Sequence, residues 1–118
     1  MASKVKLYGI KNCDTVKKAR AWLAERGIEV PFHDFKSGGI SGALIDRWEK
    51  ALGWEALLNR RGTTWRTLPD PVKERVADSG SAKKLMLEKP TVIKRPVLEL
   101  GDQVHIGFSP DGYQQLFP

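Results

Sequence analysis

A strand pattern that turns directly into a helix pattern, and is followed by a second strand pattern, most constrains how this chain can fold. Residues 4–8 alternate polar and apolar side chains, as a half-buried strand does. Residues 14–26 place their apolar side chains on one stripe of a helix, and Gly27 follows as a C-terminal stop. Residues 28–35 predict another strand, in which Pro31 indicates an edge position or an irregular start. This order predicts a βαβ unit with two parallel strands.

A hairpin pattern and a short helix pattern close the sequence. Residues 97–100 and 103–106 flank a Gly-Asp pair, which is a typical hairpin connection. A Ser-Pro pair at 109–110 then supplies an N-cap and a first-turn proline for a final helix. A βαβ unit followed by two strands and a helix is the thioredoxin arrangement. We therefore expect an α/β thioredoxin-like fold, with a four-stranded mixed sheet and flanking helices.

The stretch between these two parts has the pattern of a helical insertion. It begins at a glycine- and serine-rich break at residues 37–42. The expected elements are a helix capped by Ser41 and ended by Gly53, a helical turn at 54–58, a polar loop at 60–66, a helix at 69–77, and a helix that Ser81 caps and that ends at Glu88 before Pro90. We expect one domain over residues 1–118, with a core of about 1–36 and 91–118 and an insertion of about 37–90.

Composition narrows the class of protein. The chain has 118 residues, 41% of them hydrophobic and 29% charged, which is ordinary for a soluble domain with its own core. No apolar run approaches the roughly 20 residues of a membrane helix, and the first residues contain no signal-peptide core. We expect a cytoplasmic protein with no membrane partner. Scattered pairs of basic residues carry the net charge of +6, which favours a local site for a small anion over a nucleic-acid groove.

The chain holds one cysteine, Cys13, and two histidines. One cysteine excludes an internal disulfide, and the sequence lacks the Cys and His pairs of a zinc site, so we expect no metal. The thiol is then either a small buried core residue or a reactive group. Its position just before the first helical residue favours a reactive group, because unpaired N–H groups and the helix dipole stabilise a thiolate there. We expect a pKa below that of a free cysteine.

Neighbours of the cysteine are expected to support it. Lys11, Lys17 and Lys18 bring positive charge near the thiol. Asn12 lies in the turn before the cysteine, and Thr15 either donates a hydrogen bond to the thiolate or only occupies the first helical turn. A redox dithiol would show Cys-x-x-Cys, whereas this chain has Cys-Asp-Thr-Val. Disulfide exchange would therefore need an external thiol, such as glutathione or a redoxin.

Three arginines, Arg60, Arg61 and Arg95, are candidates for an anion site, since a planar guanidinium binds an oxyanion with two parallel hydrogen bonds. Each of them is otherwise an ordinary surface residue. Arg95 is the stronger candidate because Pro96 follows it. In thioredoxin-like folds a cis-proline faces the reactive cysteine, and cis bonds are nearly confined to X–Pro. The alternative for Pro96 is the start of an edge strand.

Three separated motifs carry a family resemblance. They are YGIKNCDTVKKAR at residues 8–20, LLNRRGTTWR at 57–66 and IKRPV at 93–97. With them the chain resembles the arsenate reductase (ArsC)/Spx family over nearly its whole length, and within that family it looks closest to the YffB-like branch. The resemblance implies a thioredoxin-like fold with a helical insertion.

The resemblance also implies roles for individual residues. In the arsenate reductases of this family a cysteine attacks arsenate, arginines hold the oxyanion, and glutathione with glutaredoxin completes the reduction. By motif, Cys13 takes the place of the nucleophile and Arg95 that of the arginine before the proline. The middle arginine falls on Arg60 or Arg61, with Arg61 favoured. No bound cofactor is implied, and glutathione is the expected co-substrate, with glutathione or a glutaredoxin-like protein as the electron donor.

One family arginine is missing from this chain. Arsenate reductases carry a further arginine near the second hairpin strand, where this chain has His105-Ile-Gly-Phe108. Losing a charge-assisted hydrogen bond costs roughly 1.5–3 kcal/mol, which disfavours arsenate as the substrate.

We expect a glutathione-dependent thiol reductase, an arsenate reductase-like oxidoreductase with one nucleophilic cysteine and a small anionic or thiol substrate. The alternative is an Spx-type regulator that binds RNA polymerase without a redox dithiol, and a further alternative is a true arsenate reductase.

Overall fold

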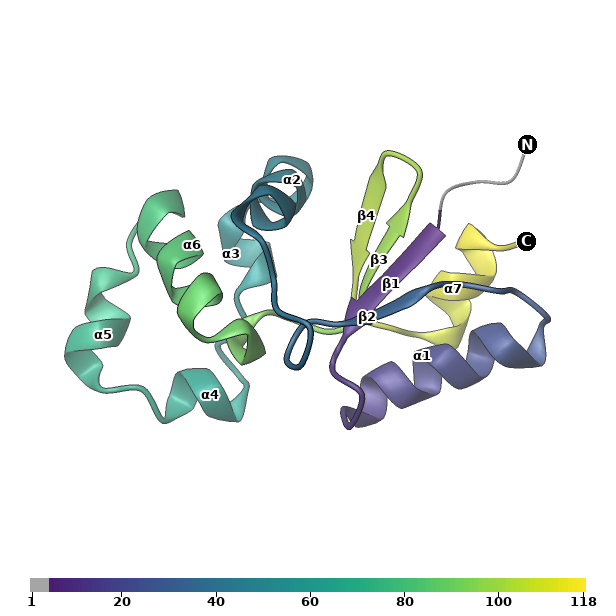
Figure 1. Cartoon of the computed structure of the whole chain (residues 1–118), viewed down its shortest axis with the longest axis horizontal. Helices are drawn as coiled ribbons and strands as arrows, with labels where there is room; N and C mark the ends of the chain where they lie inside the picture. The colour runs from purple at the N-terminus through teal and green to yellow at the C-terminus, as the bar shows by residue number, and fades with distance from the viewer. Residues whose placement is uncertain (1–4) are drawn as a thin grey trace. The chain divides into compact units, whose positions relative to one another are not determined.

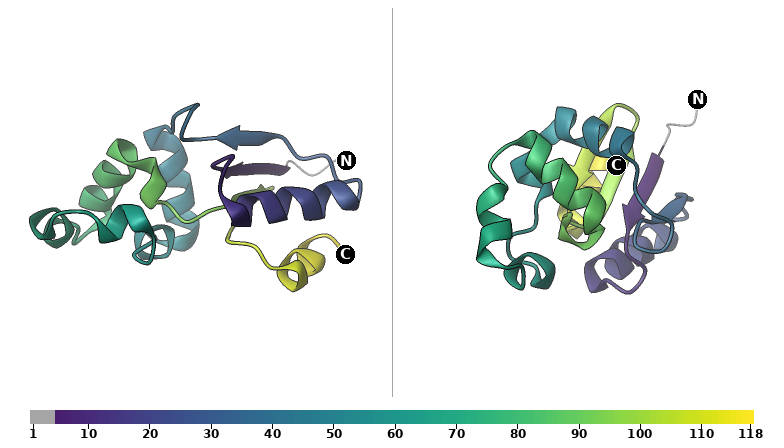
Figure 2. Two further views of the ribbon diagram at one scale, coloured as in Figure 1. Left: turned by 90° about the horizontal axis from the view of Figure 1, so that it is seen from below. Right: turned by 60° about the vertical axis from the view of Figure 1, so that its left-hand side comes forward.

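The computed structural model describes residues 5–118, which form two compact units (Figure 1, Figure 2). The first unit contains the described residues up to Phe35 together with Arg95–Pro118, and the second contains Lys36–Lys94. The first unit carries a sheet with helices, and the second is made of short helices. None of the helices within residues 5–118 is long and apolar enough to cross a membrane.

The sheet of the first unit has the spatial order β2-β1-β3-β4. Its strands are β1 (Val5–Gly9), β2 (Phe32–Asp34), β3 (Val97–Leu100) and β4 (Gln103–Ile106). β1 runs parallel to β2 and antiparallel to β3, and β3 runs antiparallel to β4. Tyr8 near the carboxyl end of β1 pairs with His33 of β2 and with Val97 at the start of β3. The predicted parallel pair and hairpin are confirmed, and three chain segments meet at this end of the sheet.

Two helices cover one face of this sheet, α1 (Asp14–Glu25) and α7 (Pro110–Leu116) (Figure 2). The buried members of the core between them and the sheet are Leu7, Ala19, Trp22, Leu23, Leu98 and Tyr113. Trp22 of α1 meets Tyr113 of α7 edge to face, with ring centroids 5.6 Å apart and planes at 90°. Such aromatic contacts add to the free energy gained by burying apolar area. The mixed sheet with these helices is the α/β thioredoxin-like fold that the sequence predicts.

The ends of the two helices follow local signals in the sequence. Gly27, after α1, has a φ of +68°, which is the left-handed conformation that ends many helices. Ser109 caps α7, because its Oγ accepts a hydrogen bond from the N–H of Gly112 at 3.0 Å. Pro110 occupies the first turn of α7, where its missing N–H costs nothing. All three signals act as the sequence predicts.

The second unit is built from short helical segments. They are α2 (Gly42–Leu52), α3 (Trp54–Leu57), α4 (Thr63–Arg66), α5 (Asp70–Arg75), α6 (Ser79–Glu88) and the 3₁₀ turn η1 (Pro90–Val92). Ser41 caps α2 by accepting a hydrogen bond from the N–H of Leu44, as predicted. Lys83 of α6 forms an ion pair with Asp46 of α2, with 2.9 Å between Nζ and Oδ1. An antiparallel bridge between Leu58 and Ile93 joins the segment after α3 to the segment after η1.

Some predicted boundaries are wrong, and each has a local physical reason. The strand expected over residues 28–35 is shorter, because Pro31 has no N–H to extend the ladder toward the N-terminus. Ser81 is not the cap of α6; Asp78 is. The Asp78 carboxylate accepts the Ser81 N–H at 2.9 Å, and the Ser81 hydroxyl accepts the Asp78 N–H at 3.2 Å, so the two close a capping box.

Other differences are smaller. The polar loop expected over 60–66 contains the helical turn α4, in which the Thr67 hydroxyl donates to the Thr63 carbonyl at 2.9 Å. The helix expected over 69–77 is α5, which starts and ends within that range. The first residue of the predicted strand 4–8 lies outside the described residues.

Candidate active site

Cys13 lies at the junction of β1 and α1. β1 ends at Gly9, and a tight turn follows that is closed by a hydrogen bond from the Cys13 N–H to the Ile10 carbonyl at 3.0 Å. Cys13 has extended backbone angles, and its carbonyl accepts the first helical hydrogen bond, from Lys17 at 2.9 Å. Its side chain is half-buried. The thiol therefore stands at the N-cap of α1, where the sequence predicts it.

The pKa of the Cys13 thiol lies below its ordinary value. Partial burial on its own raises this pKa, since it disfavours the charged form. The backbone N–H of Val16, the Arg95 guanidinium and the backbone N–H of Thr15 favour the thiolate and outweigh the burial. These first-turn N–H groups have no other partner in the helix, so they are free to stabilise negative charge on the sulfur. The surroundings of the sulfur therefore favour the thiolate over the thiol.

Arg95 lies beside the cysteine within the first unit, and Pro96 follows Arg95 in the chain. The Arg95 guanidinium acts on the Cys13 sulfur both by hydrogen bonding and by its charge. The Arg95–Pro96 peptide bond is cis, as predicted, and Pro96 is buried directly before β3. The Pro96 carbonyl accepts a hydrogen bond from the Gly107 N–H at 2.9 Å, which ties the start of β3 to the end of β4. Arg95 is thus the predicted arginine whose guanidinium interacts with the thiol, and its role in binding an anionic substrate stays a prediction.

The other neighbours of the thiol contribute less than their sequence positions suggest. Lys11, Lys17 and Lys18 are exposed, and they are not among the groups that lower the pKa of the cysteine. Asn12 is exposed in the turn and makes no side-chain hydrogen bond to any of residues 5–118. Thr15 acts through its backbone N–H and not through its hydroxyl, so the expected hydroxyl donor is absent from the groups around the thiolate.

Arg60 and Arg61 belong to the second unit, in the loop between α3 and α4. The exposed Arg60 side chain places its guanidinium 5.8 Å from the ring centroid of Trp54 and 5.8 Å from that of Trp65, within reach of a cation–π interaction with each ring. The Arg61 side chain is exposed and its backbone N–H donates to Asn59 Oδ1 at 3.2 Å. Both side chains are exposed, only that of Arg60 lies near aromatic rings of the described residues, and a role of either arginine in binding stays a prediction.

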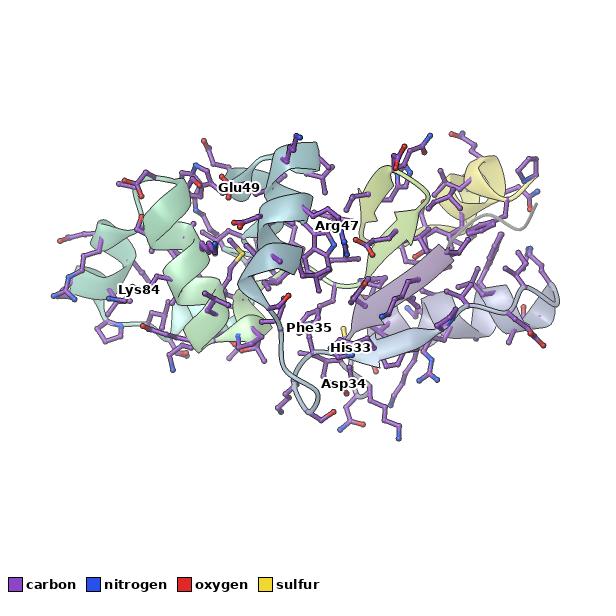
Figure 3. All side chains as sticks on the ribbon, turned by 45° about the horizontal axis from the view of Figure 1, so that its top comes forward. His33, Asp34, Phe35, Arg47, Glu49 and Lys84 are labelled. Carbon is purple, nitrogen blue, oxygen red and sulfur yellow. The ribbon has the colours of Figure 1, made fainter. Side chains whose placement is uncertain are left out.

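Sequence analysis missed Asp34. This residue ends β2, and its Oδ2 accepts a hydrogen bond from the backbone N–H of Lys11 at 2.9 Å, in the turn before Cys13 (Figure 3). The signal for it was present: an aspartate at the carboxyl end of a strand parallel to β1 meets the loop that follows β1. Asp34 therefore contacts the turn that precedes Cys13 and not the thiol itself.

A pocket of about 410 Å³ opens at the loop between β4 and α7, whose Gly107 N–H donates to the Pro96 carbonyl. It is lined by residues of β4, of α7 and of the loop between them, among them His105, Gly107, Phe108 and Tyr113. Residues 97–118 contain neither lysine nor arginine, so the lining carries no fixed positive charge. The pocket has room for an uncharged group, but its lining provides no lysine or arginine that could make a second contact with an oxyanion. Among residues 5–118, no group of three or more His, Cys, Asp or Glu side chains is placed to hold a metal ion.

Comparison with known proteins agrees with this geometry. A solved structure described as the YffB protein is 49% identical, with a TM-score of 0.88, and the match covers 94% of this chain and 96% of that one. An arsenate reductase (ArsC) related protein from Brucella melitensis is 48% identical, with a TM-score of 0.78, over 99% of this chain and 97% of that one. The global transcriptional regulator Spx 2 from Bacillus anthracis is 24% identical over 97% of this chain and 87% of its own.

The model of the ArsC family matches residues 8–116, which include the cysteine, the insertion and the cis-proline. With a thiol at the start of α1, an arginine beside that thiol and a cis-proline directly before β3 on a thioredoxin-like sheet, the chain belongs to the ArsC family.

Proposed function

We propose that this protein is a glutathione-dependent thiol reductase that uses Cys13 as its single nucleophile. The proposal is narrower than membership of the ArsC family, whose fold serves thiol-redox chemistry and, in the Spx proteins, regulation. The observation that carries it is the Cys13 thiol, which has a lowered pKa and stands between the first turn of α1 and the Arg95 guanidinium. The thiolate is the species that attacks a disulfide, so a lowered pKa increases the fraction of Cys13 that can react.

The reaction consists of two thiol–disulfide exchanges. In the first, the Cys13 thiolate attacks the glutathione sulfur of a mixed disulfide between glutathione and a substrate thiol. The sulfur–sulfur bond breaks, the substrate leaves as a thiolate that takes a proton from water, and a disulfide between Cys13 and glutathione remains. In the second, the thiolate of a free glutathione attacks the glutathione sulfur of that adduct and releases Cys13 as a thiolate. The net change reduces the substrate and produces glutathione disulfide.

The arginines hold the anionic part of the substrate in this proposal. Glutathione carries two carboxylates, and a guanidinium binds a carboxylate with two parallel hydrogen bonds. Arg95 serves two purposes, because the guanidinium that favours the Cys13 thiolate also attracts an anionic disulfide. Arg61 is proposed as the second cation, since within residues 5–118 it makes no cation–π contact, whereas the Arg60 guanidinium already interacts with the rings of Trp54 and Trp65.

Mass spectrometry and turnover test the proposal together. The protein is incubated with oxidised glutathione, and we expect one glutathione to be added at Cys13. Turnover is then measured with the mixed disulfide of glutathione and β-mercaptoethanol as substrate and free glutathione as reductant. Cys13→Ser is expected to lose both the adduct and the turnover. A wild-type protein that forms the adduct slowly, at the rate of a free cysteine, would contradict the proposal.

A second candidate function is regulation by binding RNA polymerase. The observation in its favour is the Spx 2 similarity over nearly the whole chain. The chain has valine where a redox dithiol needs its second cysteine, which removes a two-cysteine switch. Co-purification with RNA polymerase tests this function, and retention on the polymerase by both wild type and Cys13→Ser would favour the regulator over the reductase.

Arsenate reduction is a weaker candidate. Arsenate is a compact oxyanion that several cations must hold, and residues 97–118 supply none. We expect arsenate-dependent turnover with glutathione and glutaredoxin to be far slower than turnover of the mixed disulfide. A turnover rate with arsenate that equals or exceeds the rate with the mixed disulfide would contradict this expectation.

A further inference from the structure

We propose that Asp34 is a positioning residue that sets the reactivity of Cys13 by fixing the turn in front of it. The inference rests on the proposed function only in that it concerns the same thiol. It needs no particular substrate, because the reactivity of Cys13 is measurable with a simple alkylating reagent.

In the turn before Cys13, the backbone N–H of Lys11 has no acceptor within the turn itself. The turn is closed by the hydrogen bond from the Cys13 N–H to the Ile10 carbonyl at 3.0 Å. In a turn closed in this way, the N–H of the second residue, here Lys11, points away from the bond that closes the turn. A backbone donor that lacks a partner destabilises the conformation that exposes it.

Asp34 supplies the missing partner. Its Oδ2 accepts the Lys11 N–H at 2.9 Å, which is the length of a good hydrogen bond. Asp34 is itself held in place by the sheet, since it pairs with Gly9 in the parallel register and the next residue, Phe35, donates its N–H to the Gly9 carbonyl at 3.0 Å. The carboxylate is therefore held at the end of β2 (Figure 3). Its hydrogen bond to the Lys11 N–H in turn holds the segment from Ile10 to Cys13 in place.

The position of this turn decides where the sulfur of Cys13 lies. The thiolate is favoured by the N–H groups of Val16 and Thr15 and by the Arg95 guanidinium, and none of these contacts is a full capping hydrogen bond. Such interactions weaken steeply with distance and angle. A turn that relaxes moves the sulfur away from these groups, while burial continues to disfavour its charge.

Two roles of Asp34 predict opposite results. If the carboxylate acted through its charge, it would oppose a nearby thiolate, and removing the charge would make Cys13 more reactive. If it acts by holding the Lys11 N–H, removing the charge while keeping an oxygen acceptor changes little. The groups that set the pKa of Cys13 do not include Asp34, which favours the geometric role.

Two conservative variants separate these roles. Asp34→Asn keeps an oxygen acceptor at the same reach and removes the charge, whereas Asp34→Glu keeps the charge and moves the carboxylate by one methylene. The rate of alkylation of Cys13 by iodoacetamide, a neutral reagent, is measured against pH. We expect Asp34→Asn to stay within about twofold of wild type, and Asp34→Glu to be roughly fivefold slower below the pKa, the equivalent of one ordinary hydrogen bond.

A matched control and the contrary outcomes complete the test. Asp111→Asn removes one exposed carboxylate from the first turn of α7 and is expected to behave as wild type. The inference is overturned if Asp34→Glu equals wild type, or if Asp34→Asn alkylates several-fold faster. The proposed function fails separately, through a wild-type Cys13 that alkylates normally and forms no glutathione adduct.

Discussion

Arg95 and Cys13 meet within the first unit although they lie far apart in the sequence, and the guanidinium favours the thiolate by hydrogen bonding and by charge. The contact joins the start of α1 to the residue before the cis-proline. Because a positive group adjacent to a thiol lowers its pKa, this pair is the electrostatic centre of the candidate site.

Replacing Arg95 should make Cys13 less acidic. Arg95→Ala removes both the hydrogen bond and the charge, so the pKa of Cys13 rises, and alkylation by iodoacetamide below that pKa slows by roughly tenfold, the equivalent of a charge-assisted hydrogen bond. Arg95→Lys keeps the charge and loses the planar fork, so its rate should fall between those of wild type and Arg95→Ala. Arg75→Ala in α5 gives the same change of net charge and serves as the control. Equal rates for Arg95→Ala and Arg75→Ala would contradict the assignment.

The lowered pKa of Cys13 should also appear in the pH dependence of stability. Folding lowers this pKa, so between the folded and the unfolded pKa values the unfolded state binds more protons and stability rises with pH. The contribution is fully present above the unfolded pKa and is lost as the pH falls through the folded pKa. Cys13→Ser lacks it. The free energy of unfolding of both proteins is measured with denaturant at several pH values in this range. As the pH rises, we expect the free energy of unfolding of wild type to increase relative to that of Cys13→Ser. A relative decrease with rising pH would contradict the prediction.

Thr15 should tolerate loss of its hydroxyl. Its interaction with the thiolate comes from the backbone N–H, which alanine retains. The pH profile of Cys13 alkylation should therefore be the same in Thr15→Ala as in wild type. A clear rise in the pKa of Cys13 in this variant would instead assign the contact to the hydroxyl.

Arg60 and Arg61 should separate stability from substrate binding. Arg60→Ala loses two contacts with tryptophan rings, each worth about 0.5–1 kcal/mol at an exposed site, and should lower the free energy of unfolding with little change in KM. Arg61→Ala should raise the KM for a glutathione mixed disulfide and leave unfolding unchanged, because its side chain is exposed. Calorimetry measures the stability of the two variants, and steady-state kinetics measures their KM. A raised KM in Arg60→Ala together with a lowered stability of Arg61→Ala would make Arg60 the binding residue.

A side chain at Gly9 should disturb both folding and the thiol. A Cβ built there lies 2.7 Å from Cγ2 of Val16, a contact that real structures avoid. Gly9→Ala should therefore destabilise the protein by about 1–3 kcal/mol, the usual cost of overpacking. Since Val16 also supplies an N–H to the thiolate, the variant should show a raised pKa of Cys13. Gly39→Ala, where no atom lies within 4 Å but φ is +77°, separates this steric effect from backbone strain.

Much of the fold could be read from local sequence signals. Residues 97–106 form the predicted hairpin because a Gly-Asp pair with a φ of +61° at Gly101 allows the tight connection. Ser41 and Ser109 cap the helices that follow them. In each case the signal and the bond that it makes lie within three or four residues of one another.

The predictions that failed depend on competition between neighbours or on distant contacts. Ser81 is a good cap by residue type, but Asp78 takes that place and uses Ser81 as its partner. Lys17 and Lys18 are close to the cysteine in sequence, yet they point to solvent and leave its pKa to other groups. Asp34 joins the site only through the pairing of β2 with β1. Residue spacing does not reveal such relations.

Val16 occupies the position at which a dithiol enzyme would carry its second cysteine. Its side chain is fully buried, and it fits against the bare backbone of Gly9. A cysteine at this place would have one side-chain branch fewer than valine and would leave space where a valine methyl group packs. Because Cys13 is the one cysteine of the sequence, the second thiol of the proposed reaction comes from solution, and under that proposal the concentration of a small molecule sets how fast the Cys13 thiolate is regenerated.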